Sequence, residues 1–238
     1  MQRFVRNFLF VASLAAMSML SMAQDLKITF TLGLKKQDVH YHSQRYSRFN
    51  YEQDKEEFLV DYQDSVTYSI DHRAKTVLKR QFSDMEDFWR SAKSNAKGAK
   101  NFSQAQREAL GDPDDVSVEK STASVVGREC EKYEITVGKA VCTIYLDTSL
   151  ESFADRDAAM RSFGIDFAID MIDPILGSIF TNLFIERSKI RGIVLKEEWR
   201  LPWSQKPVFK SYTTEAVSIE EGPLPDSVFD LPKHYKHL

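Results

Sequence analysis

Apolar residues recur at every second position along much of this 238-residue chain, and this period restricts its fold more than any other feature. The pattern is clear in three runs, 27–34, 66–71 and 133–137. Alternation of this kind predicts strands with one face buried and the other face in water, which is typical of antiparallel sheets. We therefore expect a β-rich domain.

Short turn segments follow these runs closely. They lie at Asp71 to Lys75, at Gly138-Lys139 and at Pro202 to Pro207. Glycine, proline and small polar residues between alternating runs indicate hairpins, so consecutive strands should pair in a meander. The turn at Gly138-Lys139 would place Cys142 opposite Ile135 in the paired strand.

Two longer segments have helical composition instead. The first covers 83–110 and the second covers 152–188, where Pro174 should split or kink the helix. Apolar residues in the second segment recur at spacings of three or four on both sides of this proline. They include Met160, Phe163, Phe167 and Met171 before it, and Ile175, Leu176, Ile179, Phe180, Leu183 and Phe184 after it.

The second helical segment is hydrophobic enough that a membrane span must be considered. Asp166, Asp170 and Asp173 argue against a span, because each would cost about 2.5–3.5 kcal/mol near the centre of a bilayer. The same three carboxylates share one helical face, so the helix is expected to be amphipathic. We expect its apolar side to cover the concave face of a curved sheet, and we expect no span once the N-terminal segment is removed.

The first 23 residues have the pattern of a secretory signal peptide. Arg3 and Arg6 precede an apolar stretch from Phe8 to Leu20, and small residues end at Ala23. Residues 24–238 should then form a single β-rich domain in the periplasm or outside the cell. Loss of the two arginines leaves 30 basic against 35 acidic residues, a net charge of −5. This balance argues against nucleic-acid binding, which needs clustered Lys and Arg.

Cys130 and Cys142 are the only cysteines, and export would expose them to an oxidising compartment. A disulfide between them is therefore one hypothesis. The predicted register separates them by five residues, which at about 3.3 Å per residue exceeds the reach of a disulfide unless a bulge intervenes. Two isolated, partly buried thiols are the alternative.

No recognisable catalytic motif occurs in the sequence. There is no G-x-S-x-G elbow, no glycine-rich phosphate loop and no H-E-x-x-H. His40 and His42 would share one face of a strand, a spacing that suits a metal ligand pair, but surface histidines are the simpler interpretation. We predict a protein that is not an enzyme and has no cofactor and no metal.

The aromatic content, 12% of the residues, suggests a function instead. Most aromatic side chains should fill the core, but a curved sheet covered by a helix could also enclose an apolar cavity for a lipid or acyl chain. The candidate cavity residues are Phe163, Phe167, Met171, Ile179, Phe180, Phe184 and Trp199. The alternative is that these residues are ordinary core, and that an outer strand edge docks a protein partner of the cell envelope.

Three stretches resemble known families. The run from Phe58 to Val77, with Tyr68-Ser-Ile-Asp before a charged turn, resembles LolA-type periplasmic proteins. The run from Val126 to Tyr133 is similar to the Gly-x-x-Cys-x-x-Tyr signature of a secreted family of unknown function, number 4412. The ending from Ile219 to Tyr235 is similar to an F-x-x-P-x-x-Y element that both groups share.

This resemblance implies an α+β fold of the LolA-like type. It would be an open half-barrel, a curved antiparallel β-sheet with helices packed on its concave face. In the lipoprotein carriers of this superfamily the cavity takes up acyl chains. Together with the signal peptide and the aromatic content, this fold leads us to expect an exported protein of the cell envelope that binds a hydrophobic or lipidic ligand without catalysis.

Overall fold

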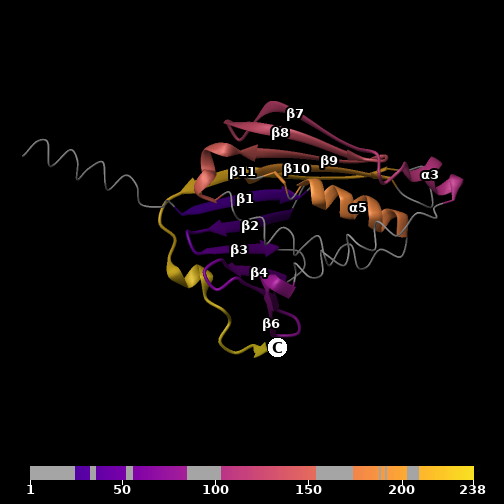
Figure 1. Ribbon diagram of the computed structural model, residues 1–238. Coiled ribbons are helices and arrows are strands. Elements are labelled where there is room, and N and C mark those ends of the chain that lie inside the picture. The colour runs from indigo at the N-terminus through magenta and orange to yellow at the C-terminus, as the bar shows by residue number, and fades with distance from the viewer. Residues whose placement is uncertain are drawn as a thin grey trace, which may run out of the picture.

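One open sheet of twelve strands dominates the computed structural model (Figure 1). The structure describes residues 25–32, 36–51, 56–84, 103–153, 174–187, 189–190, 192–202 and 209–238. The strands follow the order β12-β6-β5-β4-β3-β2-β1-β11-β10-β9-β8-β7, so the first and last strands of this order are free edges and the sheet does not close. All neighbouring pairs are antiparallel except β12 with β6.

The first half of the sheet is a meander, as the short turns predicted. Its strands are β1 Leu26–Leu32, β2 Lys36–His42, β3 Tyr46–Tyr51, β4 Glu56–Asp61, β5 Val66–Asp71 and β6 Thr76–Gln81. The turn after Asp71 forms where it was expected, because the Asp71 carboxylate accepts hydrogen bonds from the backbone N–H groups of Arg73 and Ala74 at 2.7 and 2.8 Å.

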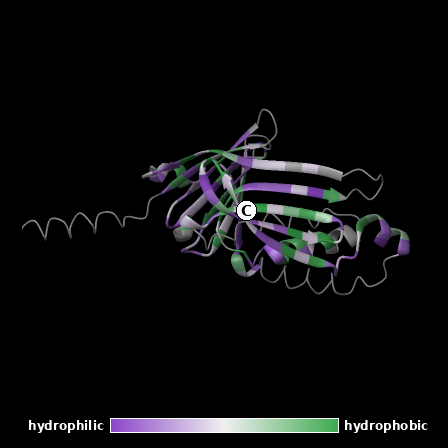
Figure 2. Ribbon diagram, turned by 90° about the horizontal axis from the view of Figure 1, so that it is seen from above, coloured by the Kyte–Doolittle hydropathy of each residue, from purple (hydrophilic) through white to green (hydrophobic). Residues whose placement is uncertain are grey.

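The second half is another meander. Its strands are β7 Val116–Val125, β8 Arg128–Val137, β9 Ala140–Asp147, β10 Ile193–Pro202 and β11 Phe209–Glu221. The β8–β9 hairpin turns at Gly138-Lys139 and pairs Ile135 with Cys142, which confirms the predicted register. Hydrophilic and hydrophobic residues are interspersed along these strands, as the alternation requires (Figure 2).

The two meanders join through β1 and β11, which are far apart in the sequence. Strand β1 pairs antiparallel with β11, from Leu26 opposite Glu221 to Leu32 opposite Thr214, with a bulge after Thr29. The Gly222 N–H also donates to the Asp25 carbonyl oxygen at 3.0 Å. The long sheet thus depends on contacts between residues almost two hundred positions apart.

The helical elements are few among the described residues. They include α3 Gln104–Leu110, the 3-10 turn η1 Thr148–Phe153, α5 Pro174–Arg187 and the 3-10 turn η2 Asp226–Phe229. Helix α5 begins at Pro174, which fits the first helical position because that residue's N–H would have no partner there. The predicted split or kink concerns the helix on both sides of this proline, and residues 154–173 lie outside the described residues. None of the described helices has the length and apolarity that crossing a membrane requires.

Two glycines hold α3 against the β8–β9 turn. Gly111 ends the helix with φ +83, and a Cβ there would lie 2.6 Å from the Gly138 backbone. The Lys139 N–H donates to the Leu110 carbonyl oxygen at 2.9 Å across this contact. The close approach therefore requires glycine at position 111.

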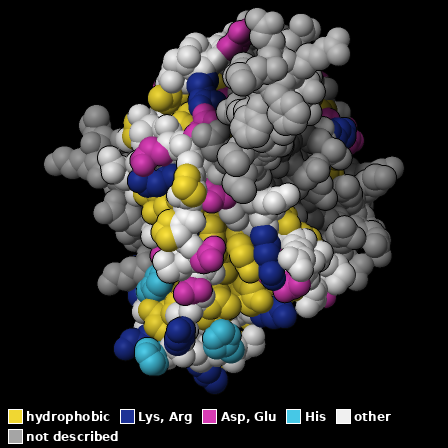
Figure 3. Space-filling view, turned by 90° about the vertical axis from the view of Figure 1, so that its left-hand side faces the viewer, with side chains coloured by type: hydrophobic (Ala, Val, Ile, Leu, Met, Phe, Trp, Pro, Cys, Tyr) yellow, Lys and Arg dark blue, Asp and Glu magenta, His cyan; other side chains and the backbone are white. Residues whose placement is uncertain are grey.

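The C-terminal strap, residues 224–238, crosses strands β3–β6. Its Phe229, Leu231 and Tyr235 pack on the cluster of Leu59, Ile70 and Val77. The strap ends in β12 Lys236–His237, which pairs in parallel with β6 and covers its edge. Seen from the side of the molecule, hydrophobic side chains lie between charged and histidine side chains (Figure 3).

The disulfide hypothesis is wrong for this structure. Cys130 and Cys142 are both free and buried. Since Cys142 lies opposite Ile135, it shares that residue's face of the sheet, whereas Cys130, five positions earlier on β8, points to the other face. Burial raises the pKa of both thiols.

Candidate functional site

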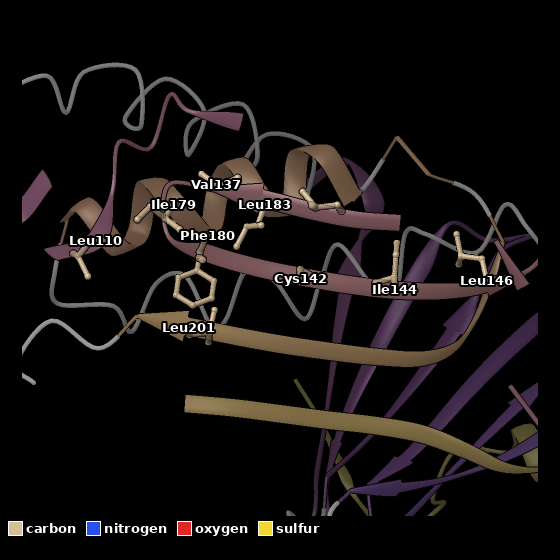
Figure 4. Close-up of a cluster of buried hydrophobic side chains, with 11 residues drawn as sticks. Leu110, Val137, Cys142, Ile144, Leu146, Ile179, Phe180, Leu183 and Leu201 are labelled. Carbon is tan, nitrogen blue, oxygen red and sulfur yellow. The ribbon is translucent and has the colours of Figure 1, made fainter. Parts of the chain in front are cut away.

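Helix α5 packs against the sheet through a continuous apolar cluster. Ile179, Phe180 and Leu183 of the helix are 0–1% exposed, and they join Ile135, Cys142 and Ile144 of β8 and β9. In the close-up, Phe180 points from α5 toward Leu201 (Figure 4). Ser178 and Thr181, on another side of the helix, are buried as well. Helix α5 is therefore covered on more than one side, unlike an ordinary surface helix.

Three aromatic side chains connect α5 to β10. The ring centroids of Phe180 and Phe184 are 6.4 Å apart, those of Phe180 and Trp199 are 6.3 Å apart, and those of Phe184 and Trp199 are 5.7 Å apart. Phe180 is fully buried, whereas Phe184 and Trp199 are only partly buried. The Phe184–Trp199 pair thus forms a rim where the helix meets the sheet.

An ion pair lies beside this aromatic rim. Arg187, one turn after Phe184, places its Nε 3.1 Å from Glu197 Oε1 of β10, two residues before Trp199. Arg187 is buried, and its Nη2 has no hydrogen-bond partner within the described part of the chain. The Cys142 thiol lies 3.8 Å from the same carboxylate oxygen. A guanidinium with a spare buried donor can donate a hydrogen bond to a polar ligand atom beside the aromatic rim.

Asn182 fixes the opposite side of α5. Its side-chain amide donates to the Pro113 carbonyl oxygen at 2.7 Å, in the segment between α3 and β7. The helix is therefore held at two points, by Asn182 toward α3 and by Arg187 toward β10. Figure 1 shows α5 lying alongside β9 and β10.

A second aromatic group lies on β1–β3. The His40 ring is 4.4 Å from Phe30 and 4.8 Å from Phe49, centroid to centroid. His42 Nδ1 and Ser47 Oγ are 2.7 Å apart, and the Tyr62 hydroxyl donates to the same Ser47 oxygen at 3.0 Å. His42, Ser47 and Tyr62 thus form a hydrogen-bonded series beside packed aromatic rings.

Burial lowers the pKa of His40 to about 3, so its ring is neutral at physiological pH. His40 and His42 do share a face, as their spacing predicted, with ring centroids 6.4 Å apart. Among the described residues no three His, Cys, Asp or Glu side chains lie close enough together to hold a metal ion.

The structure brings together four of the seven predicted cavity residues. Ile179, Phe180, Phe184 and Trp199 meet at α5 and β10, the first two as buried core and the last two at the rim. Phe163, Phe167 and Met171 lie outside the described residues. Sequence reasoning did not identify Arg187 or Glu197, for which the only signal was a basic residue at the end of an apolar helix.

Comparisons with known proteins add little to this picture. No family model matches the chain, and no curated protein matches it in sequence. The structure of PNGF-II is similar with a TM-score of 0.45 and 11% identity, over 91% of this chain but only 31% of PNGF-II. An uncharacterised conserved protein from Thermus thermophilus gives a TM-score of 0.43 and 7% identity, over 94% of this chain and 98% of that one. Neither likeness supports a functional conclusion.

Proposed function

We propose that this chain is an exported, non-catalytic protein of the cell envelope that binds a hydrophobic or lipidic ligand between α5 and the sheet. In this proposal the sheet is a half-barrel of the LolA-like type with helical cover on its concave face, and residues 1–23 are the signal that exports it. The ligand would cover the part of the Phe184–Trp199 rim that the protein leaves exposed.

The observation that carries the proposal is the Phe184–Trp199 rim. Two large aromatic side chains in contact at 5.7 Å remain partly exposed directly beside a fully buried core. Covering such rings with an acyl chain stabilises a complex by about 25 cal/mol per Å² of apolar surface removed from water. Arg187, next to this rim, would donate from Nη2 to an oxygen at the polar end of the ligand.

The experiment is extraction of lipid from the protein purified out of the host envelope. We expect mass spectrometry to recover a lipid in near-stoichiometric amount from the natural chain, and much less from Phe184→Ala. The matched control is Phe229→Ala, which removes a partly buried ring that stacks on Tyr46 in the strap, with centroids 5.3 Å apart. Equal lipid in both variants, or none in the natural chain, contradicts the proposal.

A second candidate function is a protein-interaction module with a filled core. The observation that favours it is the tight burial of Ile179, Phe180 and Leu183, which are ordinary core residues in the structure. Under this alternative the purified protein carries no lipid, and Phe184→Ala changes only its stability. The extraction experiment therefore separates the two candidates.

A further inference from the structure

The two edges of the sheet are unequal. On β6, the strap supplies partners: Leu238 N–H donates to the Val77 carbonyl oxygen at 2.9 Å, and Lys236 N–H donates to the Lys75 carbonyl oxygen at 2.9 Å. On the other edge, the ten-residue strand β7 pairs only with β8 among the described residues. A long uncovered edge is a template for another strand, and natural proteins usually protect such edges.

The geometry of the β7–β8 hairpin shows which groups face outward. The turn contains two residues, Val126 and Gly127, both with positive φ, so Val125 and Arg128 form the closing hydrogen-bonded pair. Hydrogen-bonded pairs alternate along an antiparallel ladder. The odd-numbered residues of β7 therefore bond to β8, and the even-numbered ones, from Val116 to Ser124, direct their amides and carbonyls outward.

Exposed apolar side chains gather on the same edge. Five large apolar side chains are exposed among the described residues, and three belong to β7 and its turn. These are Val116 at 37%, Val118 at 45% and Val126 at 43%. The one cation on the outward-bonding positions, Lys120, is already paired with Glu131 at 2.6 Å and lies over the Tyr133 ring. Its charge is thus drawn toward β8 and does not protect the edge.

We propose that β7 docks a second copy of this chain, edge to edge and antiparallel, about a two-fold axis through Ser121. This register pairs outward-bonding residues with outward-bonding residues on both copies. It places Val116 of each copy beside Val126 of the other, and so covers four exposed valines. It also sets Glu119 beside Ala123 and Lys120 beside Thr122, so that no like charges lie directly opposite. The result is one continuous sheet through two molecules, independent of any ligand at α5.

Cross-linking tests this register directly. In Ser121→Cys the two new thiols face each other across the axis in a non-hydrogen-bonded pair, with Cα atoms about 4.5 Å apart, within disulfide reach. In the control Ser117→Cys, on the same exposed face, the two Cα atoms lie about 26 Å apart at 3.3 Å per residue. Mild oxidation should cross-link Ser121→Cys rapidly and leave Ser117→Cys monomeric. Equal cross-linking of both variants, or of neither, overturns the proposal.

Sedimentation equilibrium of residues 24–238, from about 1 µM to about 1 mM, gives an independent test. The natural chain should show a concentration-dependent dimer. Val118→Lys should weaken this dimer about tenfold or more, because a lysine on the outward-bonding edge would have to lose water when the second strand docks. Val217→Lys changes an equally exposed valine on β11, and it should leave the dimer intact. A natural chain that stays monomeric throughout, or a dimer that Val118→Lys does not weaken, overturns the proposal.

Discussion

Two segments pack on the sheet, α5 and the C-terminal strap, and a buried arginine–glutamate pair lies beneath each of them. Under the strap both partners belong to the sheet: Arg48 Nε donates to Glu57 Oε2 at 2.8 Å, and Arg48 Nη1 donates to the carbonyl oxygens of Val228 and Asp230 at 2.8 and 3.0 Å. Glu57 also accepts from Asn50 at 3.0 Å. Under α5, Arg187 pairs with Glu197 alone among the described residues.

The Arg48–Glu57 pair is structural because it has several further polar partners, whereas Arg187 keeps an unused hydrogen-bond donor. The strap is fixed because the charges beneath it have several polar partners, and buried polar networks stabilise a structure only when their members are satisfied. Arg187 keeps a buried donor unused beside two partly exposed aromatic rings. This contrast supports the proposal of a ligand site at α5 and a structural role for the strap.

Removal of the Phe180 ring, which anchors α5, should have the largest effect on the stability of the protein. Phe180→Ala empties a fully buried site, and we expect it to lower the free energy of unfolding by about 3–5 kcal/mol. Phe229→Ala in the strap removes a partly buried ring and should cost about 1–2 kcal/mol. Urea denaturation of both variants checks this order. Equal losses would contradict a stronger apolar anchor at α5.

The two arginines should differ in their stability cost. Arg48→Met leaves Glu57 buried without its cation and two strap carbonyls without a donor, so we expect a loss of about 3 kcal/mol. Arg187→Met leaves only the less buried Glu197 without its partner, so it should lower the free energy of unfolding by about 1–2 kcal/mol. Chemical denaturation near pH 7 provides the measurement. A larger loss of stability for Arg187→Met than for Arg48→Met would show that Arg187–Glu197 is the structural pair.

The buried ring of His40 should make stability depend on pH. Because its pKa is about 3 in the folded protein and about 6.5 in the unfolded chain, the unfolded state binds the extra proton between these values. Stability should therefore fall as the pH drops from 6 to 4, by on the order of 1.4 kcal/mol per pH unit from this residue. His40→Phe should flatten the slope in pH-dependent denaturation, whereas the exposed control His234→Phe should retain it.

The smallest effect is expected at the end of the strap. Tyr235→Phe removes the hydroxyl that lies 2.9 Å from His72 Nδ1, a partly buried hydrogen bond worth about 1 kcal/mol. The packing of the ring on β4–β6 is kept. Thermal unfolding should show a small decrease in midpoint. No decrease would mean that the hydrogen bond between Tyr235 and His72 does not contribute to holding the strap.

Local signals predicted the local parts of the fold. The turn at Gly138-Lys139 determined the pairing of Ile135 with Cys142, and Pro174 marked the start of α5. The pairing of β1 with β11 and the path of the strap could not be predicted, because they join distant segments and no short-range pattern encodes them.

The candidate site was predicted in part for the same reason. Periodicity identified Phe180 and Phe184 as one helical stripe, and these residues do meet Trp199. Arg187 and Glu197 were missed, because their pairing depends on how α5 packs across β10. A charged residue in a strand or at a helix end usually points to solvent, so sequence alone favoured the wrong environment.

Fluorescence quenching at Trp199 tests the central claim most directly. The double variant Trp89→Phe/Trp203→Phe leaves Trp199 as the only tryptophan of the chain. A fatty acyl chain brominated near its middle quenches an indole only in close contact. We predict saturable quenching of Trp199 by the brominated lipid, competed by the unbrominated one and lost in the further variant Phe184→Ala. Emission that the brominated lipid leaves unchanged at saturating concentration would contradict a ligand site between α5 and β10.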